Sequence, residues 1–248
     1  MRRRRTYHDG TGNDIRIPSM LLLKPDADRL KNELLAGTPV QLQLSWPVPQ
    51  AVNGVAEYTL WMTPDDILSQ QFLFSFWEAA AELGDKAVFR PRMFVHDGTQ
   101  KGCRRYGNGE DPCNGSCTNF GRYCAPRSAY DFNSYDNKGT LILVESLRRA
   151  CIWSVYRETD GIGYEWWNYV EGWISRCGNS RYSASCAESR YDISGIEKQL
   201  VEGCMMESGN FRNNTSNTLM EQYLAEADDY DVTFAPTLFV NDAVVLEH

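Results

Sequence analysis

Hydrophobic and polar residues follow two periods along the chain, and these periods predict alternating strands and helices. Residues 55–61 and 88–95 are short apolar runs bounded by turn residues, which is typical of strands. Between them, residues 63–84 are apolar on most faces at helical length, which predicts a buried helix. Thr63 followed by Pro64 predicts its start, with Thr63 as the N-cap and the proline in the first turn. A strand, a capped helix and a second strand open several α/β folds.

The second half of the chain reads mainly as helices. Apolar residues recur at helical spacing over residues 141–155, and shorter helical stretches follow at about residues 164–176, 181–190, 194–204 and 216–227. Trp166, Val170 and Trp173 share one face of the stretch at 164–176. We interpret this stripe as core, in preference to an aromatic surface for peptides.

The last strand predicted by the pattern contains a proline. Residues 231–240 read as a strand with Pro236 inside it, although proline is normally excluded from core strands. An Ala-Pro-Thr step that enters a strand late in an α/β chain is typical of the thioredoxin fold, where the proline is cis. The pattern therefore predicts a cis bond between Ala235 and Pro236.

The N-terminal region predicts a separate small element. Residues 15–23 read as a strand, residues 25–37 as a helix that Gly37 closes, and residues 40–44 as a half-buried strand. This β-α-β piece is too small to bury a core of its own. The linker with Pro47, Pro49 and Asn53-Gly54 separates it from the rest. The expected organisation is a disordered start at 1–12, a remnant at 13–46 and a main domain at 50–248.

The charge of the chain argues against nucleic acid as a partner. The net charge is −8, although four arginines stand together at residues 2–5. An acidic body lacks the basic footprint that phosphates require, whereas it is compatible with basic peptides. We interpret the arginine run as a solvated start of the chain, in preference to a membrane or nucleic-acid patch.

The cysteines indicate an oxidising compartment. Their number is even, and four of them crowd into one short segment; they are Cys103, Cys113, Cys117, Cys124, Cys151, Cys177, Cys186 and Cys204. No histidine lies inside the crowded segment, and its spacing is not paired Cys-x-x-Cys, so disulfides are favoured over a four-cysteine zinc site. Sequons at Asn114, Asn213 and Asn214 predict glycosylation and agree with a secretory compartment. No apolar run reaches membrane-spanning length, and no signal peptide follows Met1, so we expect a signal sequence upstream.

An ordered set of motifs resembles one known family. Cys117-Thr-Asn-Phe-Gly-Arg-Tyr-Cys124-Ala-Pro resembles the signature of plant-type vacuolar sorting receptors. Further motifs follow in the order of that family: Asp131-Phe132, Leu147-Arg-Arg-Ala-Cys151, Trp166-Trp-Asn-Tyr-Val170, Arg176-Cys177, Cys186-Ala187, Gly203-Cys204 and Pro236-Thr-Leu-Phe-Val-Asn241. Upstream, Ile17-Pro18-Ser19 and the helix after it are similar to the tail of the protease-associated (PA) domain of those receptors.

The resemblance implies a receptor that is not an enzyme. Family members are type I membrane proteins that bind soluble cargo in the lumen of the Golgi, endosomal and vacuolar pathway. They carry a PA domain, a thioredoxin-like region, EGF-like repeats, one membrane span and a short sorting tail. This chain is then expected to be a fragment: an α/β thioredoxin-like domain with a helical insertion and a disulfide-rich loop, truncated at its C-terminus and preceded by a β-α-β remnant of the PA domain.

An alternative is a thiol–disulfide oxidoreductase or chaperone of the secretory pathway with the same fold. That chemistry requires a thiolate at a helix N-terminus and a second thiol to resolve it. The plant receptors carry a cysteine pair just after the first strand, but residues 62–69 of this chain contain no cysteine. A peptidase is suggested only by the PA resemblance, and no catalytic motif supports it.

The same resemblance predicts the position of a ligand site. In thioredoxin-like folds the residue before the cis-proline can pair its backbone with an extended peptide. Ala235 and Pro236 would supply that edge, and Asp65 and Asp66 would supply negative potential for a basic or apolar sorting peptide, although capping explains both aspartates equally well. We expect no catalytic residue, metal or cofactor. A second reading is that the domain only spaces the PA domain from the rest.

Overall fold

The computed structural model describes residues 22–42, 51, 54–101, 103, 113, 116–126, 138–160, 162–178, 183–211 and 215–247. The chain divides into two compact units, residues 1–48 and 49–248, which we describe separately. No helix among the described residues combines the length and the apolar character that crossing a membrane demands.

The first unit contains one described helix, α1 (Lys24–Leu35), as the sequence predicts. It buries none of its residues, and Leu34 and Leu35 are largely exposed. The strand predicted at residues 40–44 is wrong for residues 40–42, which pair with no strand in the described part of the unit, and residues 43–44 lie outside the described residues. The strand predicted at 15–23 falls almost wholly outside them too, so the PA remnant is not confirmed.

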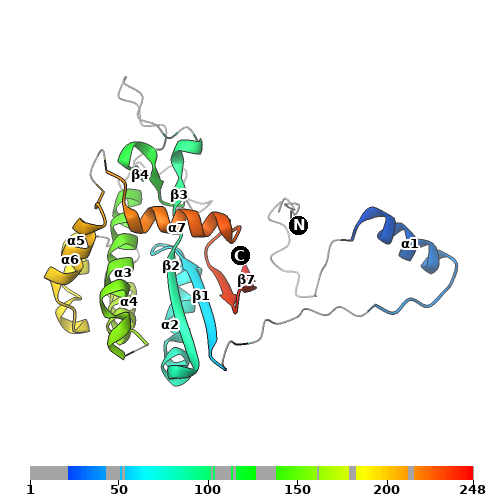
Figure 1. Ribbon diagram of the computed structural model, residues 1–248, viewed down its shortest axis with the longest axis horizontal. Helices are drawn as coiled ribbons and strands as arrows, with labels where there is room; N and C mark the ends of the chain where they lie inside the picture. The colour runs from blue at the N-terminus through cyan, green and yellow to red at the C-terminus, as the bar shows by residue number, and fades with distance from the viewer. Residues whose placement is uncertain are drawn as a thin grey trace. The chain divides into compact units, whose positions relative to one another are not determined.

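A four-stranded sheet forms the centre of the second unit, in the order β2 (Ala87–Met93), β1 (Ala56–Met62), β6 (Thr237–Val240) and β7 (Ala243–Glu247). The first two strands are parallel because the helix α2 (Ile67–Leu83) carries the chain back between them (Figure 1). The last two form a hairpin whose turn residues Asn241 and Asp242 both have positive φ. Strand β7 was not predicted from the sequence.

Two of the sequence-based predictions for α2 are wrong. The N-cap is Asp66 and not Thr63: the Asp66 carboxylate accepts a hydrogen bond from the Ser69 backbone N–H at 2.5 Å, so the helix begins at Ile67. The helix is also only half buried, because one of its faces lies on the sheet while Ile67 and Phe74 on the other face are more than half exposed.

One face of the sheet is covered by α2 and by the first two helices of an insertion that follows β5 (Tyr123–Cys124). The insertion consists of α3 (Lys138–Asp160), α4 (Tyr164–Arg176), α5 (Ala184–Glu188) and α6 (Lys198–Glu207). The predicted tryptophan stripe is confirmed as core, since Trp166, Val170 and Trp173 are at most 1% exposed. Phe89 of β2 stacks on Trp167 at 4.9 Å and meets Trp166 edge-on at 5.5 Å, which joins the insertion to the sheet.

The helix α7 (Thr218–Asp229) crosses the opposite face of the sheet (Figure 1). Tyr223 of α7 meets Trp61 of β1 edge-on at 6.4 Å, and the Arg92 guanidinium of β2 lies 5.5 Å from the Tyr223 ring centre. The Asn217 side chain caps α7 by accepting from the Met220 N–H. The described part of the unit also includes four short 3₁₀ segments: Gly84–Lys86, Gly98–Lys101, Asn119–Gly121 and Asp192–Ser194.

A small second sheet organises the cysteine-rich segment, in the order β3 (His96–Asp97), β5 (Tyr123–Cys124) and β4 (Cys117–Thr118). All eight cysteines are paired, which confirms the predicted disulfides and leaves no thiol to bind zinc. The pairs are Cys103–Cys113, Cys117–Cys124, Cys151–Cys204 and Cys177–Cys186. This topology, with its parallel pair, hairpin and helical insertion, is that of a thioredoxin-like α/β domain.

Candidate functional site

The candidate site is the corner where β1 ends, which we define as residues 63–66 together with Ala235 and Pro236. The loop 63–66 leads from β1 into α2, and both Thr63 and Pro64 are buried. The Pro64 carbonyl accepts a hydrogen bond from the buried Gln70 side chain at 2.7 Å, which ties the loop to the first turn of the helix. The loop is thus positioned from both its strand side and its helix side.

The cis-proline segment lies next to this loop. The Ala235–Pro236 bond is cis, as predicted. Thr237 pairs with Trp61 at the end of β1, so the two residues before it continue alongside the start of the loop at Thr63. Pro236 is buried, whereas Ala235 is partly exposed. The Thr237 hydroxyl donates to the Phe234 carbonyl at 2.9 Å and holds the turn.

The backbone of Ala235 is open to a partner. Among the described residues, no hydrogen bond engages its N–H or its carbonyl, and β6 begins to pair only at Thr237. Buried backbone N–H and C=O groups are nearly always hydrogen-bonded. An N–H and a C=O that lack a protein partner at the surface are therefore available to water or to the backbone of a ligand. The corner therefore presents one donor and one acceptor beside the end of the sheet.

Asp65 and Asp66 play different parts at the corner. The Asp66 carboxylate caps α2 and is partly exposed. The Asp65 Oδ1 atom is buried and has no hydrogen-bond partner among the described residues. Burial raises the pKa of the Asp65 carboxyl, and hydrogen bonds from its own backbone N–H and from Thr63 oppose that rise only in part. Most of the negative potential at the surface therefore comes from Asp66.

The positive charge of a buried arginine offsets the negative charge of Asp65. Arg149 of α3 is fully buried, and its positive charge favours the ionised form of Asp65. Its Nε atom donates to Glu145 at 3.0 Å, and its guanidinium lies 4.6 Å from the ring centre of Trp173. Its Nη1 and Nη2 atoms have no hydrogen-bond partner among the described residues. The interior beneath the corner therefore contains charged side chains of α3 packed against α4.

Exposed apolar side chains flank the corner, and sequence reasoning did not select them. Ile67 is 54% exposed, Leu68 39% and Phe234 45%. Ile67 and Leu68 form the first turn of α2, and Phe234 immediately precedes Ala235. Their sequence signal was present as apolar residues next to the two site segments, but it is the same signal that core residues give. Grouped at one edge, such residues are typical of an interaction surface.

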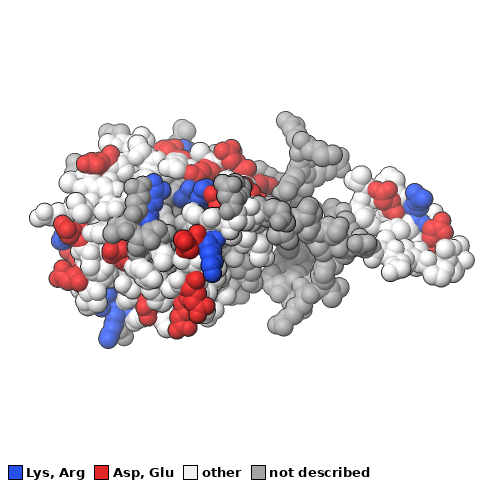
Figure 2. All heavy atoms as spheres, turned by 60° about the horizontal axis from the view of Figure 1, so that its bottom comes forward, with Lys and Arg blue, Asp and Glu red and all other residues white. Residues whose placement is uncertain are grey.

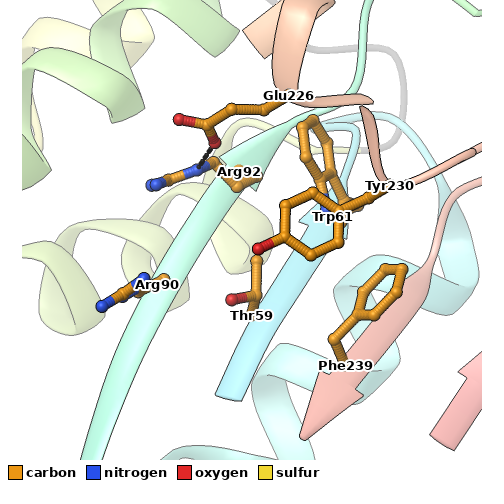
Figure 3. Close-up of a pocket in the computed structure, with 7 residues that line it drawn as sticks. All are labelled: Thr59, Trp61, Arg90, Arg92, Glu226, Tyr230 and Phe239. Carbon is orange, nitrogen blue, oxygen red and sulfur yellow. Dashed lines mark hydrogen bonds and ion pairs between the residues drawn. The ribbon is translucent and has the colours of Figure 1, made fainter. Parts of the chain in front are cut away.

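A second hollow lies between α7 and the open face of the sheet (Figure 3). It has a volume of about 180 Å³ and is lined by Thr59, Trp61, Arg90, Arg92, Glu226, Tyr230 and Phe239. Arg92 is bound to Glu226 at 2.5 Å, and Arg90 is bound at 2.9 Å to Glu57, which does not line the hollow. With both arginines already paired, this hollow is a weaker candidate than the corner.

The described contacts of the signature motif around Cys124 are structural ones. Gly121 has φ +84°, and a side chain there would collide with the Cys103 carbonyl, its Cβ lying 1.4 Å from that oxygen. Arg122 binds Glu221 and Asp97 with paired carboxylate contacts, and the Tyr123 hydroxyl donates to Glu221 at 2.7 Å. The motif therefore fastens the cysteine-rich segment to the first turn of α7.

The structure thus brings Asp65, Asp66, Ala235 and Pro236 to one edge, as the resemblance implied, whereas their role as ligand contacts remains a prediction. The sequons at Asn114, Asn213 and Asn214 lie outside the described residues. Acidic and basic side chains are interspersed on the face of the second unit that Figure 2 shows.

Comparisons with known proteins identify the family of the chain. The family model described as the vacuolar sorting receptor thioredoxin-like domain matches residues 56–246. Vacuolar-sorting receptor 4 of Arabidopsis thaliana is 32% identical over 243 residues, which cover 92% of this chain and 37% of that protein. Vacuolar-sorting receptor 1 of Pisum sativum is 31% identical over 246 residues, which cover 92% of this chain and 38% of that protein.

The chain is also similar to a solved structure, that of the thiol-disulfide exchange protein alpha-DsbA2 from Wolbachia pipientis. The TM-score is 0.46 at 10% identity, over 89% of this chain and 86% of that one. The chain spans well under half of the length of the curated receptors that it matches. Since the family model covers most of the chain, the chain belongs to the vacuolar sorting receptor family through its thioredoxin-like domain.

Proposed function

We propose that this member of the vacuolar sorting receptor family is a cargo-binding part of a receptor in the lumen of the secretory and vacuolar pathway. In this proposal the corner holds a sorting peptide of a soluble protein and leaves it chemically unchanged. The PA domain, the membrane span and the remaining lumenal parts belong to the whole receptor, of which this chain is one portion.

The observation that carries the proposal is the unpaired backbone of Ala235. A peptide in extended conformation can bind there by strand addition, with its carbonyl accepting from the Ala235 N–H and its N–H donating to the Ala235 carbonyl. Pro236 is buried and cis, so the segment is already positioned before a peptide arrives. A preformed edge lowers the entropy cost of binding.

Apolar contacts are expected to supply most of the affinity. Ile67, Leu68 and Phe234 are exposed around the corner, and burying such side chains contributes about 1.5–3 kcal/mol each when burial is complete. Asp65 is directed toward the interior and Asp66 is engaged as a cap, so steering of a basic residue is a smaller contribution. The peptide class that fits best is extended and apolar, with at most a few basic residues.

The absence of a dithiol supports binding without reaction. The loop that starts α2 reads Thr63-Pro64-Asp65-Asp66, so the positive end of the helix dipole has no thiolate to stabilise. All eight cysteines are held in disulfides. We therefore expect no turnover in an insulin-reduction assay, and turnover there would favour the oxidoreductase alternative.

Titration calorimetry on the full chain tests the proposal with a vacuolar-targeting peptide rich in apolar residues. Unmodified protein is expected to bind with a Kd in the micromolar range, and Phe234→Ala is expected to weaken binding about tenfold or more. Phe74→Ala is the matched control, because Phe74 is also an exposed phenylalanine but lies two turns along α2 from the corner.

Three results would contradict the proposal. The first is no detectable binding by the full chain when a receptor with a complete PA domain binds the same peptide, which would favour the spacer reading. The second is an equal loss of affinity in both phenylalanine variants. The third is unchanged affinity in Phe234→Ala and in the double variant Ile67→Ser/Leu68→Ser.

A further inference from the structure

Two disulfides of the cysteine-rich segment lie against each other. The Sγ atoms of Cys103, Cys117 and Cys124 all lie within 4.8 Å of one another, although Cys103 is bonded to Cys113 and the other two are bonded together. Among the described residues, this is the single place where three cysteine sulfurs gather. A thiolate released at Cys103 would therefore lie next to a second disulfide.

Glycines keep these groups close. A Cβ atom on Gly98 would lie 2.2 Å from the Cys124 Sγ and 2.9 Å from the Cys103 Cβ, so both cysteines occupy the space that a side chain would fill. Gly121 approaches the Cys103 backbone on another side in the same way. Cys103 and Cys113 are both partly exposed, whereas Cys124 is buried. An external thiol thus has access to one of the two disulfides.

We propose that this cluster is a thiol–disulfide exchange site whose reactant is a small monothiol of the glutathione class. In the first step the small thiolate attacks the Cys113 Sγ and forms a mixed disulfide there. The Cys103–Cys113 bond breaks, and its electron pair leaves with the Cys103 sulfur as a thiolate. Attack on Cys103 instead would block the sulfur that lies next to the second disulfide, so the proposed route begins with attack on Cys113.

Two further exchanges complete the rearrangement. The Cys103 thiolate attacks the Cys124 Sγ, the Cys117–Cys124 bond breaks, and the Cys117 sulfur leaves as a thiolate. Cys117 then attacks Cys113 and returns the small thiolate. Cys113 and Cys117 are close along the chain, and the Ser116 N–H between them donates to the Cys113 carbonyl at 3.0 Å. The product holds Cys103–Cys124 and Cys113–Cys117, so two disulfides exist before and after, and no net oxidation occurs.

The exchange would change the attachment between β4 and β5. Cys117 and Cys124 face each other across this strand pair, and the product lacks the covalent link between the strands. Arg122 and Tyr123 of the same segment bind α7, so the rearrangement is expected to loosen the attachment of this segment to α7. The inference does not depend on the proposed peptide binding.

Peptide mapping of the full chain after incubation with glutathione tests this inference. In the native pairing, trypsin leaves peptides 102–104, 106–122 and 123–127 joined as a trio, because residues 106–122 contain both Cys113 and Cys117. After exchange, peptide 102–104 is joined directly to 123–127, and peptide 106–122 is closed on itself. Mass spectrometry after acid quenching and alkylation distinguishes the native pairing from the exchanged pairing. The expected result is the exchanged pair, with glutathione found on Cys113 at early times.

The Cys177–Cys186 disulfide is the internal control, because no third sulfur lies near it among the described residues. It is expected to keep its pairing under the same conditions. The inference is overturned if the trio persists, if the segment is merely reduced, or if the control disulfide rearranges equally.

A pair of variants gives an independent measurement. Cys113→Ser leaves Cys103 as a thiol beside the second disulfide, so alkylation is expected to label both Cys103 and Cys117. Cys186→Ser leaves Cys177 with no neighbouring disulfide, so its label is expected to stay on Cys177. Retention of the Cys151–Cys204 pair reports that each variant is folded. A label confined to Cys103 in folded Cys113→Ser protein would overturn the inference.

Discussion

The two faces of the central sheet are built from different interactions. The face under the helical insertion is a continuous stack of rings, in which Phe89, Trp153, Trp166 and Trp167 lie at centroid distances of 4.9–5.9 Å. The face under α7 holds the Arg92–Glu226 ion pair and an open hollow of about 180 Å³ (Figure 3). Burial of apolar area stabilises far more than partly exposed ion pairs do. The first face is therefore expected to contribute more to stability than the second.

The corner, at the end of β1, belongs to neither of these two packed faces. Its apolar side chains remain exposed because neither layer of helices in the described residues covers the first turn of α2 or Phe234. Its one inward carboxylate, Asp65, interrupts the apolar packing and is offset by Arg149. Three substitutions test how much each of these regions contributes to the free energy of unfolding.

The largest effect is expected from Trp166→Ala. Trp166 is fully buried among other rings, and its indole N–H donates to the Arg149 carbonyl at 3.1 Å, so removing it leaves a cavity and deletes this hydrogen bond. The free energy of unfolding is expected to fall by about 3–5 kcal/mol in urea titrations. Tyr164→Ala is the control, because Tyr164 lies on the same helix but is 40% exposed, and its loss is expected to be about 1 kcal/mol or less. Equal losses would contradict the division of stability described above.

A smaller effect is expected from Glu221→Gln on the α7 side. The hydrogen bonds from Arg122 hold the pKa of Glu221 below its usual value, although burial opposes this. Both side chains are about one-third exposed, so the loss at pH 7 is expected to be about 1 kcal/mol after screening by solvent.

The pH dependence of this variant gives the sign of the interaction. A lowered folded-state pKa contributes stability above the unfolded pKa of about 4.3 and loses it as pH falls through the folded value. The difference between Glu221→Gln and unmodified protein is therefore expected to shrink below about pH 4, as measured by urea unfolding at several pH values. A difference that stays constant down to pH 2 would contradict it.

The smallest effect, and one of opposite sign, is expected from Asp65→Asn. Burial raises the pKa of Asp65, so its ionised form destabilises the folded state once pH exceeds the unfolded value of about 3.9. The uncharged variant is expected to be slightly more stable than unmodified protein at pH 7 and equal to it near pH 3. Thermal unfolding at the two pH values measures this. Lower stability of the variant at pH 7 would mean that the attraction of Arg149 outweighs burial.

Much of the fold was predictable from local patterns, and particular residues show where prediction stopped. The β1–α2–β2 unit, the long helix α3 and the cis bond before Pro236 follow from periodicity and proline chemistry, which depend on neighbours in sequence. The cap at Asp66 was misassigned because Thr63 and Asp66 both offer a suitable oxygen, and only the path of the loop selects between them. Strand β7 was missed because its short apolar run does not by itself predict a strand, and its strand conformation depends on pairing with β6.

The sequence by itself determined the class of the domain, the secretory character of its cysteines and the position of its cis-proline, because these rest on residue types in fixed order. The tertiary structure alone decided which cysteines pair among 105 possible arrangements, because pairing depends on which sulfurs meet in space. It also decided that Ile67, Leu68 and Phe234 remain exposed while Trp166 and Trp173 are buried. Apolar side chains look alike in sequence, and only packing decides which of them are left at a surface to bind another molecule.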